Sequence, residues 1–157
     1  MVTKTKSAPV SSTPRSAAPR AAAPRQKKSQ LLARGLGRRK CAVARIWLRR
    51  GSGALIINGI DYKKYFETDI NRAEASSPFR AVPVSTNYDI EANVNGGGLC
   101  AQAGAVKVGI ARALVSMDEA VRPVLRQYGM LTMDSRRKER KKYGQKAARR
   151  KFQFVKR

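Results

Sequence analysis

Charge is distributed so unevenly along this chain that only its middle can fold as a globular domain. Residues 1–35 carry eight Lys or Arg and no acid, and residues 136–157 carry twelve with a single acid, Glu139. Residues 36–135 carry fourteen basic and nine acidic residues, which is close to balance. Like charges repel, and a segment with few apolar residues cannot offset the entropy lost on ordering. We therefore expect one domain at 36–135, between a disordered extension at 1–35 and an extended basic tail at 136–157.

The excess of positive charge indicates a polyanionic partner. The formal net charge is +24, and two cationic arms on one domain are typical of proteins that bind nucleic acid. In the C-terminal tail, Tyr143, Phe152 and Phe154 are interspersed among the basic residues. Aromatic rings can stack on bases while Lys and Arg hold phosphates. The basic cluster at residues 38–40 extends the same phosphate-binding surface into the domain.

Catalytic and metal-binding residues are scarce. The chain has no histidine, its ten acids are scattered among cations, and its two cysteines, Cys41 and Cys100, lie far apart in the sequence. We interpret the cysteines as reduced thiols, one on a strand and one at a helix start. No metal, no cofactor and no enzymatic activity are expected. No run of about 18 apolar residues is evident, so we expect a soluble, non-secreted protein without a membrane span.

The first 35 residues are low in complexity, and two interpretations of them remain open. Ala, Pro, Ser and basic residues dominate, and Pro14, Pro19 and Pro24 would break any helix. The segment is either an accessory RNA-binding arm or a plastid or mitochondrial targeting peptide, since such peptides are also poor in acids. The first interpretation places the protein in the cytoplasm, and the second places it in an organelle.

Three strands are predicted from residues that alternate in polarity. In residues 41–49 every second residue is apolar, which is the period of a half-buried strand. Residues 54–58 form a second strand, and the glycines at 51 and 53 are a turn signal, which predicts a β-hairpin. Residues 88–94 alternate in the same way.

Helices are predicted at 62–66, at 99–117 and from 122 to 128, where Gly129 would end the last one. Residues between the first helix and the strand at 88 contain Pro78 and Pro83 and are assigned as irregular. This order predicts an α+β fold with helices on one face of a small, mostly antiparallel sheet. The glycines at 96–98 either turn the chain or hold a phosphate, and they lack the Gly-Lys-Ser/Thr ending of a nucleotide-binding loop.

Four ordered motifs make the sequence similar to a known family. Residues 37–45 (GRRKCAVAR), 96–105 (GGGLCAQAGA), 109–114 (GIARAL) and 139–144 (ERKKYG), followed by a terminal Lys-Arg, resemble the universal ninth proteins of the ribosomal small subunit. The resemblance runs from Gly37 to the end of the chain. It implies an α+β domain like the second domain of the fifth small-subunit protein. It also implies a structural role in the ribosome: binding ribosomal RNA in the head, beside neighbouring head proteins, and reaching the peptidyl-site transfer RNA with the tail.

The resemblance also assigns roles to individual residues. Lys156 and Arg157, at the tip of the tail, would contact transfer RNA phosphates. We expect ribosomal RNA to be bound by the basic cluster of the domain and by basic and aromatic residues of the tail. These are Arg38, Arg39, Lys40, Arg136, Arg137, Arg140, Lys141, Lys142, Tyr143, Lys146, Arg149, Arg150, Lys151 and Phe152. Three positions depart from the usual family pattern, namely Cys100, Val108 and Val155, where serine or glycine, histidine and serine are common.

Two other classes of protein share parts of this pattern. A DNA-compacting protein would have a similar charge, but it would bind duplex DNA as well as ribosomal RNA. A small phosphotransferase would need Lys or carboxylate groups around the glycines at 96–98 and would bind nucleotide saturably. Both remain alternatives at the level of the sequence.

Overall fold

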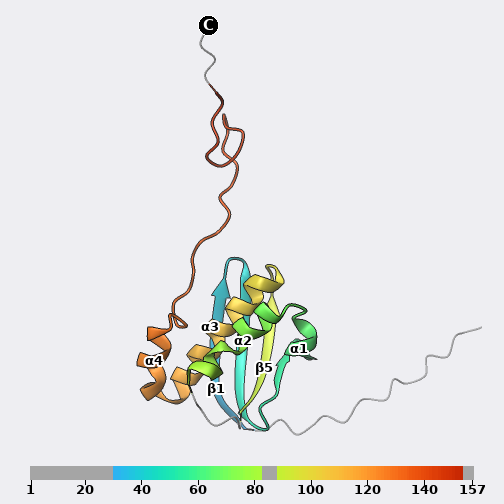
Figure 1. Cartoon of the computed structure of the whole chain (residues 1–157), viewed down its shortest axis with the longest axis vertical. Coiled ribbons are helices and arrows are strands. Elements are labelled where there is room, and N and C mark those ends of the chain that lie inside the picture. The colour runs from blue at the N-terminus through green and yellow to red at the C-terminus, as the bar shows by residue number, and fades with distance from the viewer. Residues whose placement is uncertain (1–29, 83–87, 154–157) are drawn as a thin grey trace, which may run out of the picture.

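The protein is an α+β domain built on one five-stranded sheet, as the sequence predicts (Figure 1). The computed structural model describes residues 30–82 and 88–153. Its elements are β1 (Leu31–Arg39), β2 (Ala42–Arg50), β3 (Leu55–Ile57), β4 (Ile60–Asp61), α1 (Tyr62–Tyr65), α2 (Asp69–Ala81), β5 (Tyr88–Asn95), α3 (Leu99–Met117), the 3-10 helix η1 (Glu119–Val121) and α4 (Arg122–Gln127). The strand order is β1-β2-β5-β3-β4, and only the β3–β5 pair is parallel.

The sheet begins earlier than the sequence predicts. Strand β1 starts at Leu31, so the assignment of residues 31–35 to a disordered extension is wrong. Two of the β1 residues that face the helices are Gly35 and Gly37. Because glycine is not hydrophobic, the sequence of β1 lacks the alternation of apolar and polar residues by which a strand is recognised. Strands β1 and β2 form a tight antiparallel hairpin, with Lys40 at a positive φ of 53° in the turn. Cys41 lies in that turn and not on a strand.

The predicted hairpin between residues 41–49 and 54–58 is wrong. Strand β5 lies between β2 and β3, so that Ile90 pairs with Leu48 on one side and with Leu55 on the other. The carboxylate of Asp89 accepts hydrogen bonds from three successive backbone N–H groups, of residues 52–54, at 2.8, 3.1 and 3.1 Å. These bonds hold the glycine-containing loop against the start of β5, and the chain then continues as β3 on the side of β5 away from β2.

Helix α2 was missed because it contains a proline. Pro78 lies in its last turn and has no N–H to donate to the carbonyl of Glu74, four residues earlier. The hydroxyl of Ser77 donates to that carbonyl instead, at 2.8 Å. A neighbouring side chain therefore satisfies the acceptor that proline leaves open, and the helix extends to Ala81.

Helix α3 is the centre of the core and has the predicted bounds. It packs on β1 and β2 with one side, and α2 covers its other side (Figure 1), so that eleven of its nineteen residues are buried. The contact with β1 is very close: a Cβ added to Gly37 would lie 1.8 Å from the carbonyl oxygen of Ala105. The sheet and α3 therefore meet through their backbones, with small residues on both sides.

Helix α3 is long and apolar enough to cross a membrane by length and composition, although Gln102, Lys107 and Arg112 interrupt its apolar residues. An 18-residue stretch within Leu99–Met117 has a mean hydropathy of 1.3, and 61% of that stretch is buried inside the domain. A helix in which apolar residues predominate is expected where protein packs against most of its surface. In this domain, the sheet and α2 pack against α3 in this way.

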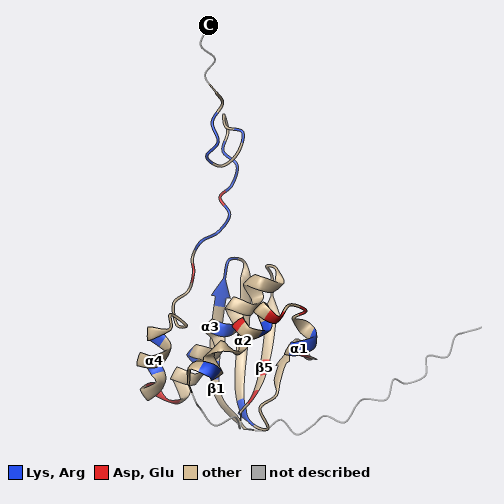
Figure 2. Cartoon of the chain, in the orientation of Figure 1, with Lys and Arg blue, Asp and Glu red and all other residues tan. Residues whose placement is uncertain are grey.

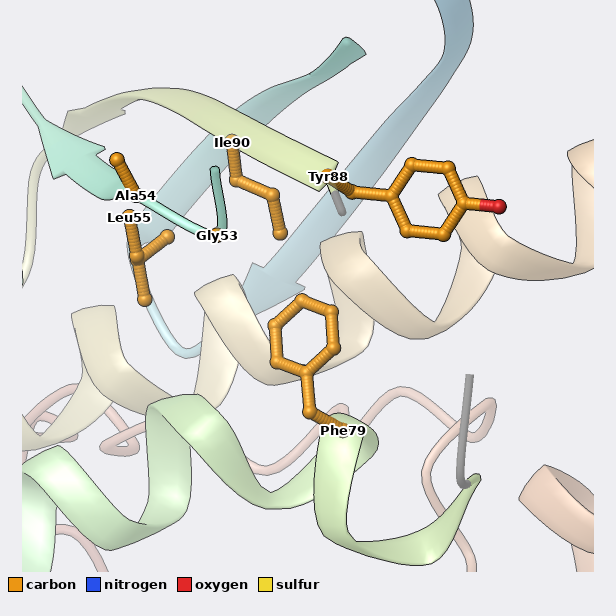
Figure 3. Close-up of a pocket in the computed structure, with 6 residues that line it drawn as sticks. All are labelled: Gly53, Ala54, Leu55, Phe79, Tyr88 and Ile90. Carbon is orange, nitrogen blue, oxygen red and sulfur yellow. The ribbon is translucent and has the colours of Figure 1, made fainter. Parts of the chain in front are cut away.

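The two remaining predicted helices are present as α1 and as α4, with Pro123 in the first turn of α4. Near α2, the domain has an apolar hollow of about 200 Å³ (Figure 3). It is lined by Gly53, Ala54, Leu55, Phe79, Tyr88 and Ile90. These residues include no charged group, so the hollow is not suited to a phosphate.

Candidate nucleic-acid interface

A basic hollow lies where the C-terminal tail leaves the domain. It measures about 290 Å³ and is formed by the end of β1, one side of α3 and the first residues after α4. We call it the tail-root hollow, and it is lined by Arg38, Arg39, Gly104, Lys107, Val108, Gly129, Thr132, Asp134 and Arg136. Of the predicted RNA-binding residues, it brings together two from the domain and one from the tail. Guanidinium and ammonium groups gathered around one open space are suited to a phosphate.

One wall of the tail-root hollow is an ion-pair network centred on Glu74. Its Oε1 accepts from Arg39 Nη1 at 2.9 Å and from Lys107 Nζ at 3.0 Å. Gly104 makes room for the guanidinium, since an added Cβ would lie 2.4 Å from Arg39 Cδ. Glu74 thus holds two cations, one from the sheet and one from α3, side by side at the edge of the hollow. Because all three side chains are partly exposed, the network also remains accessible to water.

Another part of the lining is the Asp134–Arg136 pair at the start of the tail. Arg136 donates to both carboxylate oxygens of Asp134, with Nε–Oδ1 and Nη2–Oδ2 distances of 2.9 Å, and its backbone N–H donates to Oδ1 at 3.1 Å. These bonds lower the pKa of Asp134 from 3.8 to about 2, and the side-chain bonds from Arg136 make the largest contribution. The same bonds raise the pKa of Arg136. Arg112, from α3, donates to the carbonyl of Leu36 at 2.8 Å and to that of Leu131 at 3.4 Å. It thereby ties the segment leading to the tail to β1.

The predicted cluster at residues 38–40 is divided by the strand geometry. Arg38 and Arg39 end β1 and both line the tail-root hollow, while Lys40 lies in the hairpin turn. Arg39 is half-buried against Glu74, whereas Arg38 and Lys40 are exposed. The sequence placed the cluster at the beginning of a strand, and the structure places it at the end of β1.

The tail runs away from the domain and carries a nearly continuous series of basic residues (Figure 2). The exposed predicted RNA-binding residues in it are Arg136, Arg137, Arg140, Lys141, Lys142, Tyr143, Lys146, Arg149, Arg150, Lys151 and Phe152. Lys156 and Arg157 lie outside the described residues, as do Phe154 and Val155. Within the described tail, cations are therefore displayed to solvent on all sides.

Part of the tail differs from the extended chain that the sequence predicts. Residues 139–150 fold into a closed loop, which we call the tail loop (Figure 1). Glu139 Oε2 accepts from Arg149 Nε at 3.0 Å, and Arg149 Nη2 donates to Glu139 Oε1. The hydrogen bonds from Arg149, together with the charges of Arg149 and Lys142, lower the pKa of Glu139. The sole acid of the tail therefore offsets local repulsion at one point and closes the loop.

The glycines at 96–98 have a structural role in the domain. Gly96 and Gly97 have positive φ values of 73° and 68°, and added Cβ atoms would approach Cys41 and Ala42 at 2.6 and 3.0 Å. They let the chain turn sharply between β5 and α3 against the β1–β2 hairpin. Cys100 follows in the first turn of α3 as an exposed free thiol.

Sequence reasoning missed several residues of the tail-root hollow. Lys107 and Glu74 are held together by contacts across α2 and α3, and no spacing in the sequence signals that contact. A usable signal did exist for Lys107, because it is one of only two charged residues in the long apolar helix α3. Val108, where the resembling family commonly has histidine, also lines the hollow and is buried.

The comparisons with known proteins identify the family. Residues 37–157 match the family described as Ribosomal protein S9/S16. The small ribosomal subunit protein uS9 of Cytophaga hutchinsonii is 48% identical over 122 residues, covering 78% of this chain and 95% of the relative. The proteins of that name from Chlorobium limicola and Borrelia garinii are 47% and 48% identical, covering 78% and 80% of this chain and 95% and 93% of the relatives. This chain belongs to the S9 family of ribosomal proteins.

Membership of the S9 family confirms the class predicted from the motifs. The chain is a structural, non-enzymatic component of the small ribosomal subunit and is located in the ribosome. The phosphotransferase alternative is therefore wrong. The matched residues, 37–157, also begin where the resemblance was found to begin.

Proposed function

We propose that this S9-family chain binds small-subunit ribosomal RNA in the head, through the tail-root hollow and the tail, and reaches the peptidyl-site transfer RNA with Lys156 and Arg157. The observation that carries the proposal is the continuity of positive charge from the hollow along the tail (Figure 2). The domain docks on folded RNA, and the tail lies where phosphates crowd and neutralises their repulsion. Neighbouring head proteins complete its surroundings.

The chemistry of the residues supports this division of labour. A guanidinium offers a planar fork of donors to a phosphate, and lysine acts as a point charge, so both bind RNA backbone without reading sequence. Contacts at the tail tip would therefore favour any transfer RNA in position. A charged hydrogen bond contributes about 1.5–3 kcal/mol.

The organisation of the chain follows from the same proposal. Residues 36–135 form the RNA-docking domain, extended at its start by the first residues of β1, and residues 136–157 form the tail. Residues 1–35, apart from the start of β1 at Leu31, are an accessory basic arm of a protein in a bacterial-type cytoplasm. The organellar alternative is distinguished by whether mature protein isolated from ribosomes retains these residues.

Chemical footprinting of reconstituted small subunits tests the proposal. The experiment compares protection of ribosomal RNA and of bound transfer RNA in three kinds of subunit: with the full chain, without it, and with a chain lacking Lys156 and Arg157. We expect both chains to protect the head RNA. Only the full chain should protect the anticodon stem of the transfer RNA. Diffuse protection of RNA without preferred sites would instead indicate a generic polyanion binder, the class to which a DNA-compacting protein belongs.

A further inference from the structure

We propose that the tail loop, residues 139–150, is a preformed RNA-binding element in which the Glu139–Arg149 pair is the clasp and Tyr143 is a platform for an unpaired nucleobase. The proposal rests on the proposed function, because the base would belong to small-subunit ribosomal RNA. It goes beyond that function in giving the single acid of the tail a positioning role. It also assigns a stacking contact, and not a phosphate contact, to the tip of the loop.

The clasp is well formed for an exposed site. Arg149 approaches Glu139 with two nitrogens, and its Nε lies 3.0 and 3.1 Å from the two carboxylate oxygens. A fork-to-carboxylate pair fixes orientation as well as distance. It joins residues ten positions apart, so it closes the whole loop, unlike the Asp134–Arg136 pair, which joins residues two positions apart.

Two more contacts hold the second half of the tail loop. The backbone N–H of Lys146 donates to the carbonyl of Arg150 at 2.9 Å. The ammonium of Lys146 lies 5.4 Å from the centre of the Phe152 ring, within the range of a cation–π contact. Gly144 turns the chain at a positive φ of 64°, a conformation that other residues adopt only with strain. The loop is thus ordered by its own residues, outside the domain.

Tyr143, next to that glycine, is 95% exposed. Within residues 30–82 and 88–153, its ring and hydroxyl make no contact that would account for an aromatic residue there. Exposing a large ring to water without packing it gives no stability to the free protein. Lys141 and Lys142 precede it and can bind the phosphates that flank a base stacked on the ring. Stacking of this kind is typical of single-stranded RNA, whose bases can be splayed out.

The clasp and the net charge predict opposite effects of one substitution, Glu139→Gln, on the affinity for RNA. Replacing Glu139 by Gln removes the only acid between residues 136 and 157. If the tail bound RNA by charge alone, this change would strengthen binding to a polyanion. If the loop must be closed to present Tyr143, the same change weakens binding, because ordering the loop then costs binding free energy.

The experiment measures the affinity of the full chain for deproteinised small-subunit ribosomal RNA and for an unrelated RNA of equal length. We expect Glu139→Gln to weaken binding to ribosomal RNA by about three- to tenfold. The matched control is Glu119→Gln, which removes the same charge and breaks another exposed Glu–Arg pair, with Arg122, outside the tail. We expect that control to bind as tightly as the unmodified chain or slightly more tightly. Exchanging the partners, by Glu139→Arg with Arg149→Glu, re-forms the pair at unchanged net charge and should bind ribosomal RNA more tightly than Arg149→Glu alone.

The platform is tested with two substitutions of the same residue. Tyr143→Ala should lower the affinity about tenfold, whereas Tyr143→Phe, which keeps the ring, should stay within about twofold. One unpaired base should lose its protection from base-specific chemical modification with Tyr143→Ala but not with Tyr143→Phe. Circular dichroism checks that the domain is folded in every variant.

Each outcome decides one part of the proposal. Binding by Glu139→Gln that equals or exceeds that of Glu119→Gln would overturn the clasp. Equal binding by Tyr143→Ala and the unmodified chain would overturn the platform. If the unmodified chain does not prefer ribosomal RNA to the unrelated RNA, the proposed function fails, and the inference fails with it. Preference for ribosomal RNA that survives both substitutions leaves the function standing without this loop mechanism.

Discussion

The side chain of Asn58 pairs with the backbone of Val94 as a neighbouring strand would. Its Oδ1 accepts from the Val94 N–H at 2.9 Å, and its Nδ2 donates to the Val94 carbonyl at 3.0 Å. Asn58 begins the turn between β3 and β4 at a positive φ of 50°, and Gly59 follows at 83°. One residue therefore makes the turn and continues the pairing of the short strand β3 with β5.

Substitutions of Asn58 should separate these two roles. Asn58→Gly keeps the positive φ but loses both side-chain bonds, and we expect it to lower the free energy of unfolding by about 1–2 kcal/mol. Asn58→Ala should cost about 1 kcal/mol more, because the left-handed conformation is strained for alanine. Urea unfolding followed by circular dichroism measures both. Equal stability of the two variants would show that the turn conformation contributes nothing.

The close contact between β1 and α3 predicts a large effect from one methyl group. Gly37→Ala places its Cβ 1.8 Å from the carbonyl oxygen of Ala105 and 2.6 Å from the N of Gly109, so backbone must move. Such overpacking costs about 1–3 kcal/mol or more. Gly98→Ala is the control, since its Cβ meets nothing within 4 Å, and its cost should stay below about 1 kcal/mol. Thermal unfolding distinguishes the two, and equal melting temperatures would contradict the backbone contact.

The sequence predicted those elements whose pattern is local. Helix α3 and strand β5 carry regular apolar spacing, so their existence and bounds followed from the chain alone. Strand β1 did not, because its helix-facing residues Gly35 and Gly37 are selected for close approach and not for hydrophobicity. Helix α2 was also not predicted, because the Ser77 hydroxyl satisfies the Glu74 carbonyl that Pro78 leaves open, and helix propensities do not include such a compensation.

The candidate site was predictable where it depends on composition and motifs. Charge density identified the tail, whereas the roles that the family motifs assign to Lys156 and Arg157 stay predictions, because both lie outside the described residues. The tail-root hollow was not predictable, because Glu74, Lys107 and Asp134 come together only through the packing of α2, α3 and the segment after α4. The tail loop was not predictable either, since one acid among many cations does not indicate which cation it pairs with.

The Asp134–Arg136 pair predicts a specific acid titration. A carboxyl whose pKa is lowered on pairing stabilises the paired state above its ordinary pKa, and this stabilisation is lost as the pH falls through the lowered value. For Asp134 the window runs from about 3.8 down to about 2. Carbon-detected NMR of the side-chain carboxyl should report a midpoint near the lower value, and Arg136→Ala should return it towards 3.8. A midpoint that does not move would show that the pair does not form in solution.

Salt dependence tests whether the tail cations contact phosphates individually. Each neutralised phosphate contributes about −0.7 to −0.9 to the slope of log affinity against log salt. If Lys141 and Lys142 each contact one phosphate of ribosomal RNA, Lys141→Gln with Lys142→Gln should make the slope shallower by about 1.4–1.8. The matched control is Lys63→Gln with Lys64→Gln, which removes the same charge from exposed positions on α1. Its slope should be unchanged, because α1 lies on the side of the domain away from the tail (Figure 2). An equal change of slope in both double variants would mean that the whole protein binds as a diffuse positive charge, and that the tail has no specific binding site on the RNA.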